Sequence, residues 1–123
     1  MDGPMITYSQ ISGGISIDDD LIGTGYSGNG RGVDNPALER ERKIGPIPRG
    51  KWKITKWVKS YPGRGPIVAI LAPVGHTAHG RSGFLIHGDN AKLDKSGSWG
   101  CIVASRDIRT KLRKSGEIDL EVI

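Results

Sequence analysis

Residues 51–74 read KWKITKWVKSYPGRGPIVAILAPV and contain two strand patterns separated by a turn. The first pattern, in residues 52–59, consists of two alternating sets of side chains. One set is Trp52, Ile54, Lys56 and Val58, and the other is Lys53, Thr55, Trp57 and Lys59. Such alternation is typical of a strand with two different faces. Residues 62–66, PGRGP, form a turn sequence, and the apolar run at residues 67–74 favours a strand buried in the core. This stretch therefore predicts β-structure.

The segments on either side continue the pattern. Residues 5–17 carry isoleucines and a tyrosine spaced mostly by twos around a glycine pair, as in a hairpin. Short apolar runs at residues 84–87 and 101–104 predict two more strands, and residues 118–122 alternate in a closing strand. No long apolar helical pattern is present. We therefore expect a mainly β fold.

One short helix is predicted near the C-terminus. Ser105 can cap it, because a serine oxygen accepts a hydrogen bond from a free N–H of the first turn. Ile108 and Leu112 would lie on one face of a helix that runs to about Ser115. Gly116 then ends it.

The chain has 123 residues, enough for one domain with a hydrophobic core, and no repeat, linker or low-complexity tract divides it. We expect a single catalytic domain over residues 1–123. Nineteen glycines and seven prolines indicate many tight turns. Among the connections, residues 36–43 predict a short helical turn that begins at Pro36, and the two prolines in residues 44–50 predict a rigid extended segment.

Composition narrows the class of function. The single cysteine, Cys101, excludes an internal disulfide and paired metal-binding cysteines. A net charge of +5 suits a polyanionic partner, but no aromatic and basic ladder offers nucleic-acid bases a stacking platform. No run approaches the about 20 apolar residues of a membrane helix, and the N-terminus lacks a signal-peptide pattern. We expect no membrane insertion, and either export without a cleavable signal or a leader missing from this sequence.

Three patterns that resemble ligand sites lack required residues. The glycines of residues 23–35 are not followed by the Lys-Ser/Thr of a phosphate loop or placed between a strand and a helix. Residues 18–20, three aspartates, lack the alternation and the glycine of a calcium loop and predict a solvated turn. His76, His79 and His87 have no carboxylate or thiol partner at ligand spacing. We expect no metal and no cofactor.

The chemistry-bearing residues lie in residues 84–104, FLIHGDNAKLDKSGSWGCIVA. His87 ends one apolar strand just before Gly88, and Cys101 follows Gly100 and opens another. If these strands are neighbours, the thirteen residues between His87 and Cys101 fold back and bring imidazole and thiol together. The imidazole then either takes the thiol proton or stabilises a thiolate as an ion pair, which lowers the thiol pKa. We predict Cys101 as nucleophile and His87 as its base.

Neighbouring residues suggest supporting roles. Asp89 can orient His87, although a backbone carbonyl could hold the imidazole instead. Gly100 leaves room for a substrate, and N–H groups around Ser98 to Cys101 can stabilise an oxyanion. The alternative reading is a basic, non-catalytic β-domain that binds an anionic cell-wall polymer and buries Cys101 for packing.

The order of these residues resembles the catalytic motif of the L,D-transpeptidases, in which a strand-borne His-Gly precedes Ser-X-Gly-Cys and an apolar residue. His87-Gly88 and Ser98-Trp99-Gly100-Cys101-Ile102 match it. Trp99 stands where many members carry a second histidine, so the role of that histidine is not carried over. Further matches make the chain similar to the type VI secretion L,D-transpeptidase effector family: Tyr26-Ser27-Gly28, Asn35-Pro36, Gly45-Pro46-Ile47-Pro48-Arg49-Gly50 with Trp52 and Ile54, and Arg81 before the His-Gly-Asp at 87–89.

This resemblance implies a compact L,D-transpeptidase-like β-sandwich with one short helix. It implies an enzyme that cleaves or exchanges the terminal D-alanine of peptidoglycan stem tetrapeptides through a Cys101 thioester. Arg81, Tyr26 and Ser27 are expected to hold substrate carboxylates or backbone, with Ser98, Trp99 and Gly100 beside them. The resemblance also implies a monomeric antibacterial toxin that acts in the target cell's periplasm and has a cognate immunity protein.

Overall fold

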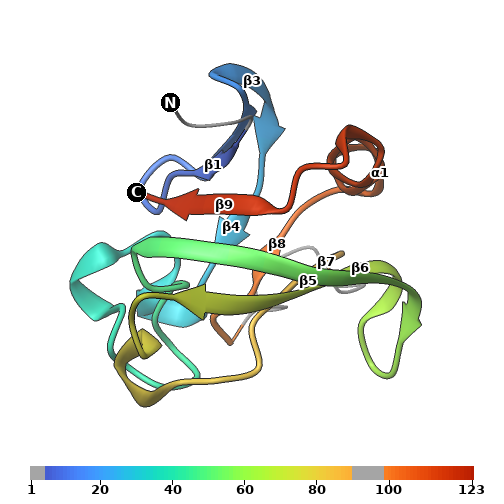
Figure 1. Cartoon of the computed structure of the whole chain (residues 1–123). Helices are drawn as coiled ribbons and strands as arrows, with labels where there is room; N and C mark the ends of the chain where they lie inside the picture. The colour runs from blue at the N-terminus through green and yellow to red at the C-terminus, as the bar shows by residue number, and fades with distance from the viewer. Residues whose placement is uncertain (1–4, 90–98) are drawn as a thin grey trace.

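The computed structural model describes residues 5–89 and 99–123. Within them, nine strands, one α-helix and three short 3-10 helices are present (Figure 1). The strands are β1 (Ile6–Tyr8), β2 (Gly14–Ile17), β3 (Asp20–Thr24), β4 (Tyr26–Ser27), β5 (Gly50–Tyr61), β6 (Gly65–Val74), β7 (Leu85–His87), β8 (Ile102–Val103) and β9 (Asp119–Val122). The helix is α1 (Arg106–Ser115), and the 3-10 helices are η1 (Gly30–Gly32), η2 (Pro36–Leu38) and η3 (Ala78–Gly80). The fold is mainly β, as predicted.

These strands form one sheet in the order β3-β2-β1-β9-β5-β6-β7-β8-β4. Two pairs of neighbours are parallel, β1 with β9 and β7 with β8, and the others are antiparallel. β9 lies between β1 and β5, as Figure 1 shows. The last strand of the chain therefore joins the N-terminal strands to the long β5–β6 hairpin.

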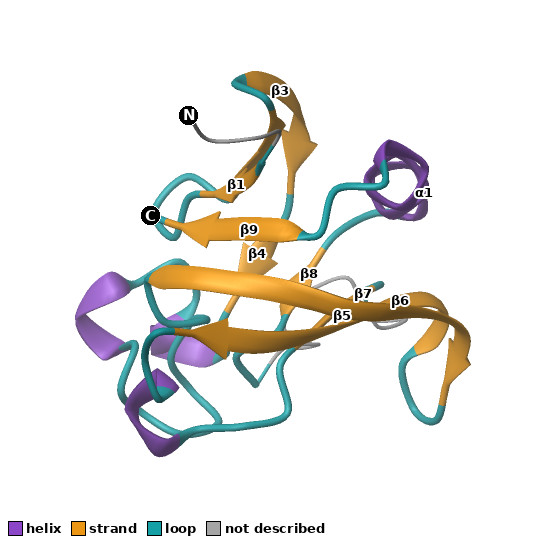
Figure 2. Cartoon of the chain, in the orientation of Figure 1, coloured by secondary structure: helices purple, strands orange, loops and turns teal. Residues whose placement is uncertain are grey.

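The two ends of the sheet meet at Gly25. β3 and β4 stand at opposite ends of the strand order, yet Gly25 alone separates them in the chain. Its N–H donates to Gly13 O at 2.8 Å, and a Cβ on it would lie 2.1 Å from the carbonyl oxygen of Val103. The sheet must therefore curl until its ends touch. The two layers of the predicted β-sandwich are therefore parts of one curled sheet, whose strands are drawn in orange in Figure 2.

The β5–β6 hairpin confirms the two strands predicted for residues 51–74, with a bulge that the alternation does not reveal. The pairing register shifts between Ile54 and Lys56. Trp52 and Ile54 are buried, but after the extra residue the core face passes to Trp57, which packs on the main core, and Lys56 is exposed. The bulge thus explains why Lys56 is exposed although it belongs to the same alternating set of residues as the buried Trp52.

The C-terminal helix agrees with its prediction. Ser105 accepts a hydrogen bond from Ile108 N at 3.2 Å, and Gly116 ends α1 with φ 72°. Ile108 and Leu112 are buried against the sheet. Figure 2 shows α1 apart from the three 3-10 helices, which gather on the other side of the view. None of the helices in the described part of the chain is long and apolar enough to cross a membrane.

Other predicted segments are shorter or shifted. The opening hairpin is present as β1 and β2, and the turn predicted at residues 36–43 is helical only in η2, which begins at Pro36. Ile118 precedes β9 and is 45% exposed, although its carbonyl accepts a hydrogen bond from Ile54 N. Leu120 and Val122 of the closing strand are buried as expected.

Candidate active site

Strands β7 and β8 place His87 and Cys101 on one face of the sheet. The strands are parallel neighbours, with Ile86 opposite Ile102. Because side chains alternate along a strand, the residues flanking this pair, His87 and Cys101 among them, face the other way together. Strands lie about 4.8 Å apart and rise about 3.3 Å per residue, so the two Cα atoms lie about 8 Å apart. An imidazole and a thiol can meet across that distance.

The main chain fixes the tautomer of His87. Its Nδ1 lies 2.6 Å from the carbonyl oxygen of Gly88. A carbonyl only accepts hydrogen bonds, so neutral His87 donates through Nδ1 and carries its lone pair on Nε2. Nε2 is buried and has no hydrogen-bond partner among the described residues. The ring is therefore held by a backbone carbonyl, the alternative left open above, and Nε2 is the atom that can take a proton.

Cys101 is buried at the edge of a cavity. Its side chain packs with Val68 and Leu85, only 6% of the residue is exposed, and Sγ lies 3.6 Å from Gly83 O. The residue nevertheless lines an open cavity of about 270 Å³. Its other lining residues are mostly polar or basic: Arg42, Lys43, Arg64, Gly80, Arg81, Ser82, Gly83 and Trp99. A thiol at this position can be approached by an anionic substrate.

Burial keeps the two groups neutral. Burial raises the pKa of the Cys101 thiol, and the positive charges of Arg64 and Arg81 only partly oppose it. Burial lowers the pKa of His87, and Arg64 and Arg109 lower it further. Both shifts favour thiol and neutral imidazole over thiolate and imidazolium. A thiol pKa lowered by an imidazolium is thus wrong for the free protein, whereas proton transfer to a neutral imidazole fits.

Asp89 is bonded to Tyr26, whose hydroxyl donates to Asp89 Oδ1 at 2.6 Å. Tyr26 belongs to β4 and lies opposite Val103 of β8. The Nδ1 proton of His87, which an orienting carboxylate would accept, goes to Gly88. The orienting role expected of Asp89 is therefore filled by the main chain. Tyr26 itself is buried.

Ser27 supports the loop before the cysteine. It is fully buried, and its Oγ donates to Gly100 O at 3.1 Å and accepts from Ile47 N at 2.8 Å. Its two bonds tie Gly100 to the extended segment of residues 44–50. The hydroxyl expected to hold substrate thus contacts the main chain of the protein, and positions the residue before Cys101.

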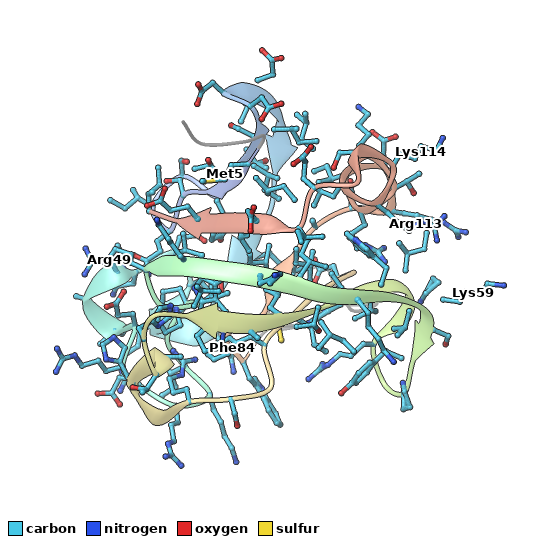
Figure 3. All side chains as sticks on the ribbon, viewed as in Figure 1. Met5, Arg49, Lys59, Phe84, Arg113 and Lys114 are labelled. Atoms are coloured by element: carbon cyan, nitrogen blue, oxygen red, sulfur yellow. The ribbon has the colours of Figure 1, made fainter. Side chains whose placement is uncertain are left out.

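Arg81 has a similar structural role. Its Nη atoms donate to four main-chain carbonyls, those of Glu39, Gly45, Pro46 and Trp99. A guanidinium has five N–H groups, so only Nε–H is left for a substrate carboxylate. Arg81 is buried and lies over the ring of Phe84, which is labelled in Figure 3. It fastens Trp99, two positions before Cys101, to the segment that contains Gly45 and Pro46.

Of the remaining expected residues, Trp99 lines the cavity, Gly100 lies between Trp99 and Cys101 in the chain, and Ser98 lies outside the described residues. Gly100 adopts φ +120°, and a Cβ on it would lie 2.3 Å from Arg81 Nη2. Trp99 is 56% exposed, and Lys43 Nζ lies 5.5 Å from its ring centroid. The glycine thus permits close packing of Arg81, while the indole offers an open apolar surface beside the thiol.

The comparisons with known proteins begin with a family model. The model described as the Tlde1 domain matches residues 22–121. The chain belongs to the Tlde1 domain family. This is a family of type VI effector domains, and the matched range includes both His87 and Cys101. No curated protein sequence is significantly similar to the chain.

The fold of this Tlde1 domain is that of the L,D-transpeptidases. An L,D-transpeptidase from Stackebrandtia nassauensis superposes with a TM-score of 0.65 at 13% identity, covering 99% of this chain and 56% of that one. L,D-transpeptidase 1 of Mycobacterium tuberculosis gives 0.57 at 15%, covering 98% and 62%. An L,D-transpeptidase from Mycobacterium smegmatis gives 0.54 at 14%, covering 98% and 58%. The chain thus spans little more than half of these solved structures, and at such identities the likeness establishes the fold alone.

Two arginines of this Tlde1 domain were missed by the sequence analysis. Arg109 of α1 is buried and donates to the carbonyls of Ala104, Pro66 and Ile67, which ties α1 to β6. An arginine three positions before Leu112, and so on the same side of the helix, was a usable signal for such a role. Arg64 lies in the PGRGP turn between β5 and β6, where the sequence indicated only the turn.

His87 borders a second cavity of the Tlde1 domain, with a volume of about 440 Å³. Basic side chains and one carboxylate dominate its wall, which consists of Gly63, Arg64, Gly65, Pro66, His87, Gly88, Asp89, Ala104, Ser105, Arg106 and Arg109. Cys101 and His87 therefore line different cavities.

The other histidines and the aspartate turn have structural partners. His76 Nε2 contacts Lys51 O at 2.9 Å, and His79 Nε2 contacts Glu39 Oε2 at 3.1 Å. Asp18 Oδ1 accepts from Met5 N at 2.9 Å. Within residues 5–89 and 99–123, no three His, Cys, Asp or Glu side chains gather in a way that could hold a metal ion.

Proposed function

We propose that this chain is a peptidoglycan-modifying cysteine enzyme, an L,D-carboxypeptidase or L,D-transpeptidase that acts on the terminal D-alanine of stem tetrapeptides. The observation that carries the proposal is the placement of the Cys101 thiol and the unpartnered Nε2 of His87 on one face of two adjacent strands. Membership of the Tlde1 family and the L,D-transpeptidase fold support it.

In the first half-reaction, Nε2 of His87 takes the thiol proton while Sγ of Cys101 bonds to the carbonyl carbon between meso-diaminopimelate and D-alanine. The tetrahedral intermediate collapses and its C–N bond breaks. The imidazolium returns the proton to the amine of the departing D-alanine. A thioester between Cys101 and the diaminopimelate carbonyl is left.

In the second half-reaction, the nucleophile decides the outcome. Water or an amine attacks the thioester carbon, and Nε2 of His87 takes the proton of the nucleophile and passes it to the departing thiolate. Water gives carboxypeptidase activity. The amine of a D-amino acid or of a second stem peptide gives transpeptidation, and the thiol is regenerated in both cases.

The charge of the thiol cavity fits this substrate. Stem peptides carry several carboxylates, and the cavity wall holds the cations of Arg42, Lys43 and Arg64. The exposed indole of Trp99 can pack on apolar parts of the peptide. Arg81, Tyr26 and Ser27 act in this proposal by holding the walls of the site, through the bonds described above.

The decisive experiment is mass spectrometry of muropeptides after incubation with the wild-type protein, Cys101→Ala and His87→Gln. We expect wild type to remove D-alanine from tetrapeptides or exchange it, and both variants to lose about 10³-fold or more of this rate. Retained melting temperatures show that the variants still fold. Wild-type turnover by Cys101→Ala would refute the nucleophile. Co-sedimentation with peptidoglycan without any product would favour the basic binding domain.

We further propose that the chain is an antibacterial effector that acts in the target cell's periplasm and is neutralised by a cognate immunity protein. Family membership supports this role. The protein should be harmless in the cytoplasm, where mature wall is absent, and toxic when directed to the periplasm with a signal peptide. Growth measured in both compartments, with Cys101→Ala as control, tests this. Equal growth in both would argue against a toxin.

A further inference from the structure

Arg64 lies where the two cavities of the site meet. It is the residue that both cavity walls share among the residues described, since the thiol cavity and the imidazole cavity otherwise have different linings. Gly63 and Gly65 flank it with φ of +76° and +82°, and its backbone N–H donates to Tyr61 O at 2.9 Å. The backbone therefore forms the turn, and the turn does not depend on the Arg64 side chain.

The Arg64 guanidinium has no hydrogen-bonding or ion-pair partner in the part of the chain that the structure describes. Arg81 and Arg109, the other arginines that act on the electrostatics of the catalytic pair, donate instead to main-chain carbonyls. Arg64 thus presents a half-buried cation at the boundary between the two cavities, and none of the described residues occupies its donors.

The base of this turn is firmly held. Ile67 has φ +55°, which is a strained conformation for a β-branched residue, and its carbonyl accepts a hydrogen bond from Arg109 at 3.0 Å. Arg109 also donates to Pro66 O. Strain that the surrounding structure maintains is typical of functional segments. The turn that carries Arg64 is therefore fixed over the cavities by α1.

In the proposed reaction, the scissile bond of the substrate must lie between the thiol cavity and the imidazole cavity. Its carbonyl carbon must approach Sγ of Cys101, while the departing amine must approach Nε2 of His87. The carboxylate of the departing amino acid is only two bonds from that amine. We propose, on the basis of the function above, that Arg64 binds this carboxylate and makes the enzyme select peptides that end in a free carboxylate next to the scissile bond. A guanidinium suits this task because it grips a carboxylate through two parallel hydrogen bonds.

Two synthetic stem tetrapeptides test the proposal, one ending in D-alanine and one in D-alaninamide. We expect wild type to prefer the acid in kcat/KM. Arg64→Gln should lower kcat/KM for the acid roughly 10- to 100-fold and leave the amide nearly unchanged. Arg64→Lys should restore only part of the preference, because lysine cannot bind in bidentate fashion. Arg42→Gln removes a cation from the thiol cavity alone and should keep the acid-to-amide ratio of wild type.

A binding measurement separates this proposal from the proposed function. In the Cys101→Ala background, calorimetry should show tighter binding of the acid than of the amide, and Arg64→Gln should abolish the difference. If wild type turns over neither peptide, the proposed function fails, and the binding comparison still decides the role of Arg64. An acid-to-amide ratio that Arg64→Gln leaves unchanged, in turnover or in binding, would overturn the inference. Melting temperatures confirm that each variant is folded.

Discussion

At the scale of single residues, Cys101 has the titration of a buried thiol. Because burial raises the pKa of the thiol, the folded protein holds less thiolate near neutral pH than the unfolded chain. We expect iodoacetamide to alkylate native Cys101 more slowly than the same residue in urea, with a half-point above the about 8.5 of a free cysteine. The chain has one cysteine, so the mass of the labelled protein reports on it alone. Faster alkylation of the native protein would reveal a preformed thiolate.

Gly100 makes a second prediction possible. A methyl group there would lie 2.3 Å from Arg81 Nη2 and 3.2 Å from Phe84 Cε1, and the carbonyl bonds of Arg81 leave it little freedom to move. We expect Gly100→Ala to destabilise the protein and to remove most of its activity. Gly116→Ala is the matched control, with φ +72° but nothing within 4 Å, and should cost only about 1–2 kcal/mol of left-handed strain. Urea unfolding of both variants measures the difference, and equal losses would contradict it.

At the scale of elements, α1 depends on its cap. Ser105→Ala removes the acceptor for Ile108 N, so we expect a loss of about 1 kcal/mol in the free energy of unfolding. Lys111→Ala, which breaks an exposed ion pair with Asp107, should change it by less than about 0.5 kcal/mol. Thermal melts followed by circular dichroism compare the two. A larger effect of Lys111→Ala would mean that the cap is not what stabilises α1.

The same elements show what the sequence predicts and what it does not. The β5–β6 hairpin follows from alternation and the PGRGP turn, and α1 follows from its capping residues. Local patterns do not reveal β3 and β4, because these short strands lie in a glycine-rich segment and are held by partners distant in the chain. The bulge at Ile54 is equally hidden, since it depends on pairing.

The candidate site also has features that the sequence predicts and features that it does not. His87 and Cys101 could be singled out because each stands beside a glycine at the end of an apolar run. The hydrogen bonds of Ser27 and Arg81 could not, because they depend on which loops pack next to Cys101. Nor could the neutral state of Cys101 and His87, because the direction of both pKa shifts is set first by burial. Sequence patterns thus indicate candidate reactive side chains better than they indicate the groups that surround those side chains.

At the scale of the whole molecule, Glu39 links three distant segments and should make stability depend on pH. It accepts hydrogen bonds from Gln10 and Arg49 and pairs with His79. Burial alone would raise its pKa, but these bonds hold it at about 2 against an ordinary 4.5. As pH falls, the unfolded chain therefore takes up this proton first. The stabilisation is complete above the unfolded pKa and is lost between pH 4.5 and about 2.

We therefore expect Glu39→Gln to be less stable than wild type by roughly 1–3 kcal/mol at neutral pH, because the amide keeps one acceptor oxygen but lacks the negative charge that strengthens the hydrogen bonds from Arg49 and His79. The difference should shrink towards zero as the pH falls to about 2 and below, where Glu39 becomes protonated in the folded protein as well as in the unfolded chain. Urea unfolding at a series of pH values measures it. A difference that stays constant over this range would show that the ionisation of Glu39 contributes nothing.

The position of β9 has a consequence for biosynthesis. This strand pairs Leu120 with Ile6 and with Trp52, so the gap between β1 and β5 is filled by the strand of this domain that is synthesised last. Until residues 119–122 emerge, the nascent domain holds two groups of strands with a gap between them. Folding of the domain should thus begin only after these residues have left the ribosome. Protease digestion of stalled ribosome complexes tests this: only a chain that includes residues 119–122, extended by a linker long enough to clear the exit tunnel, should resist cleavage, and protection of a chain stopped before residue 119 would disprove it.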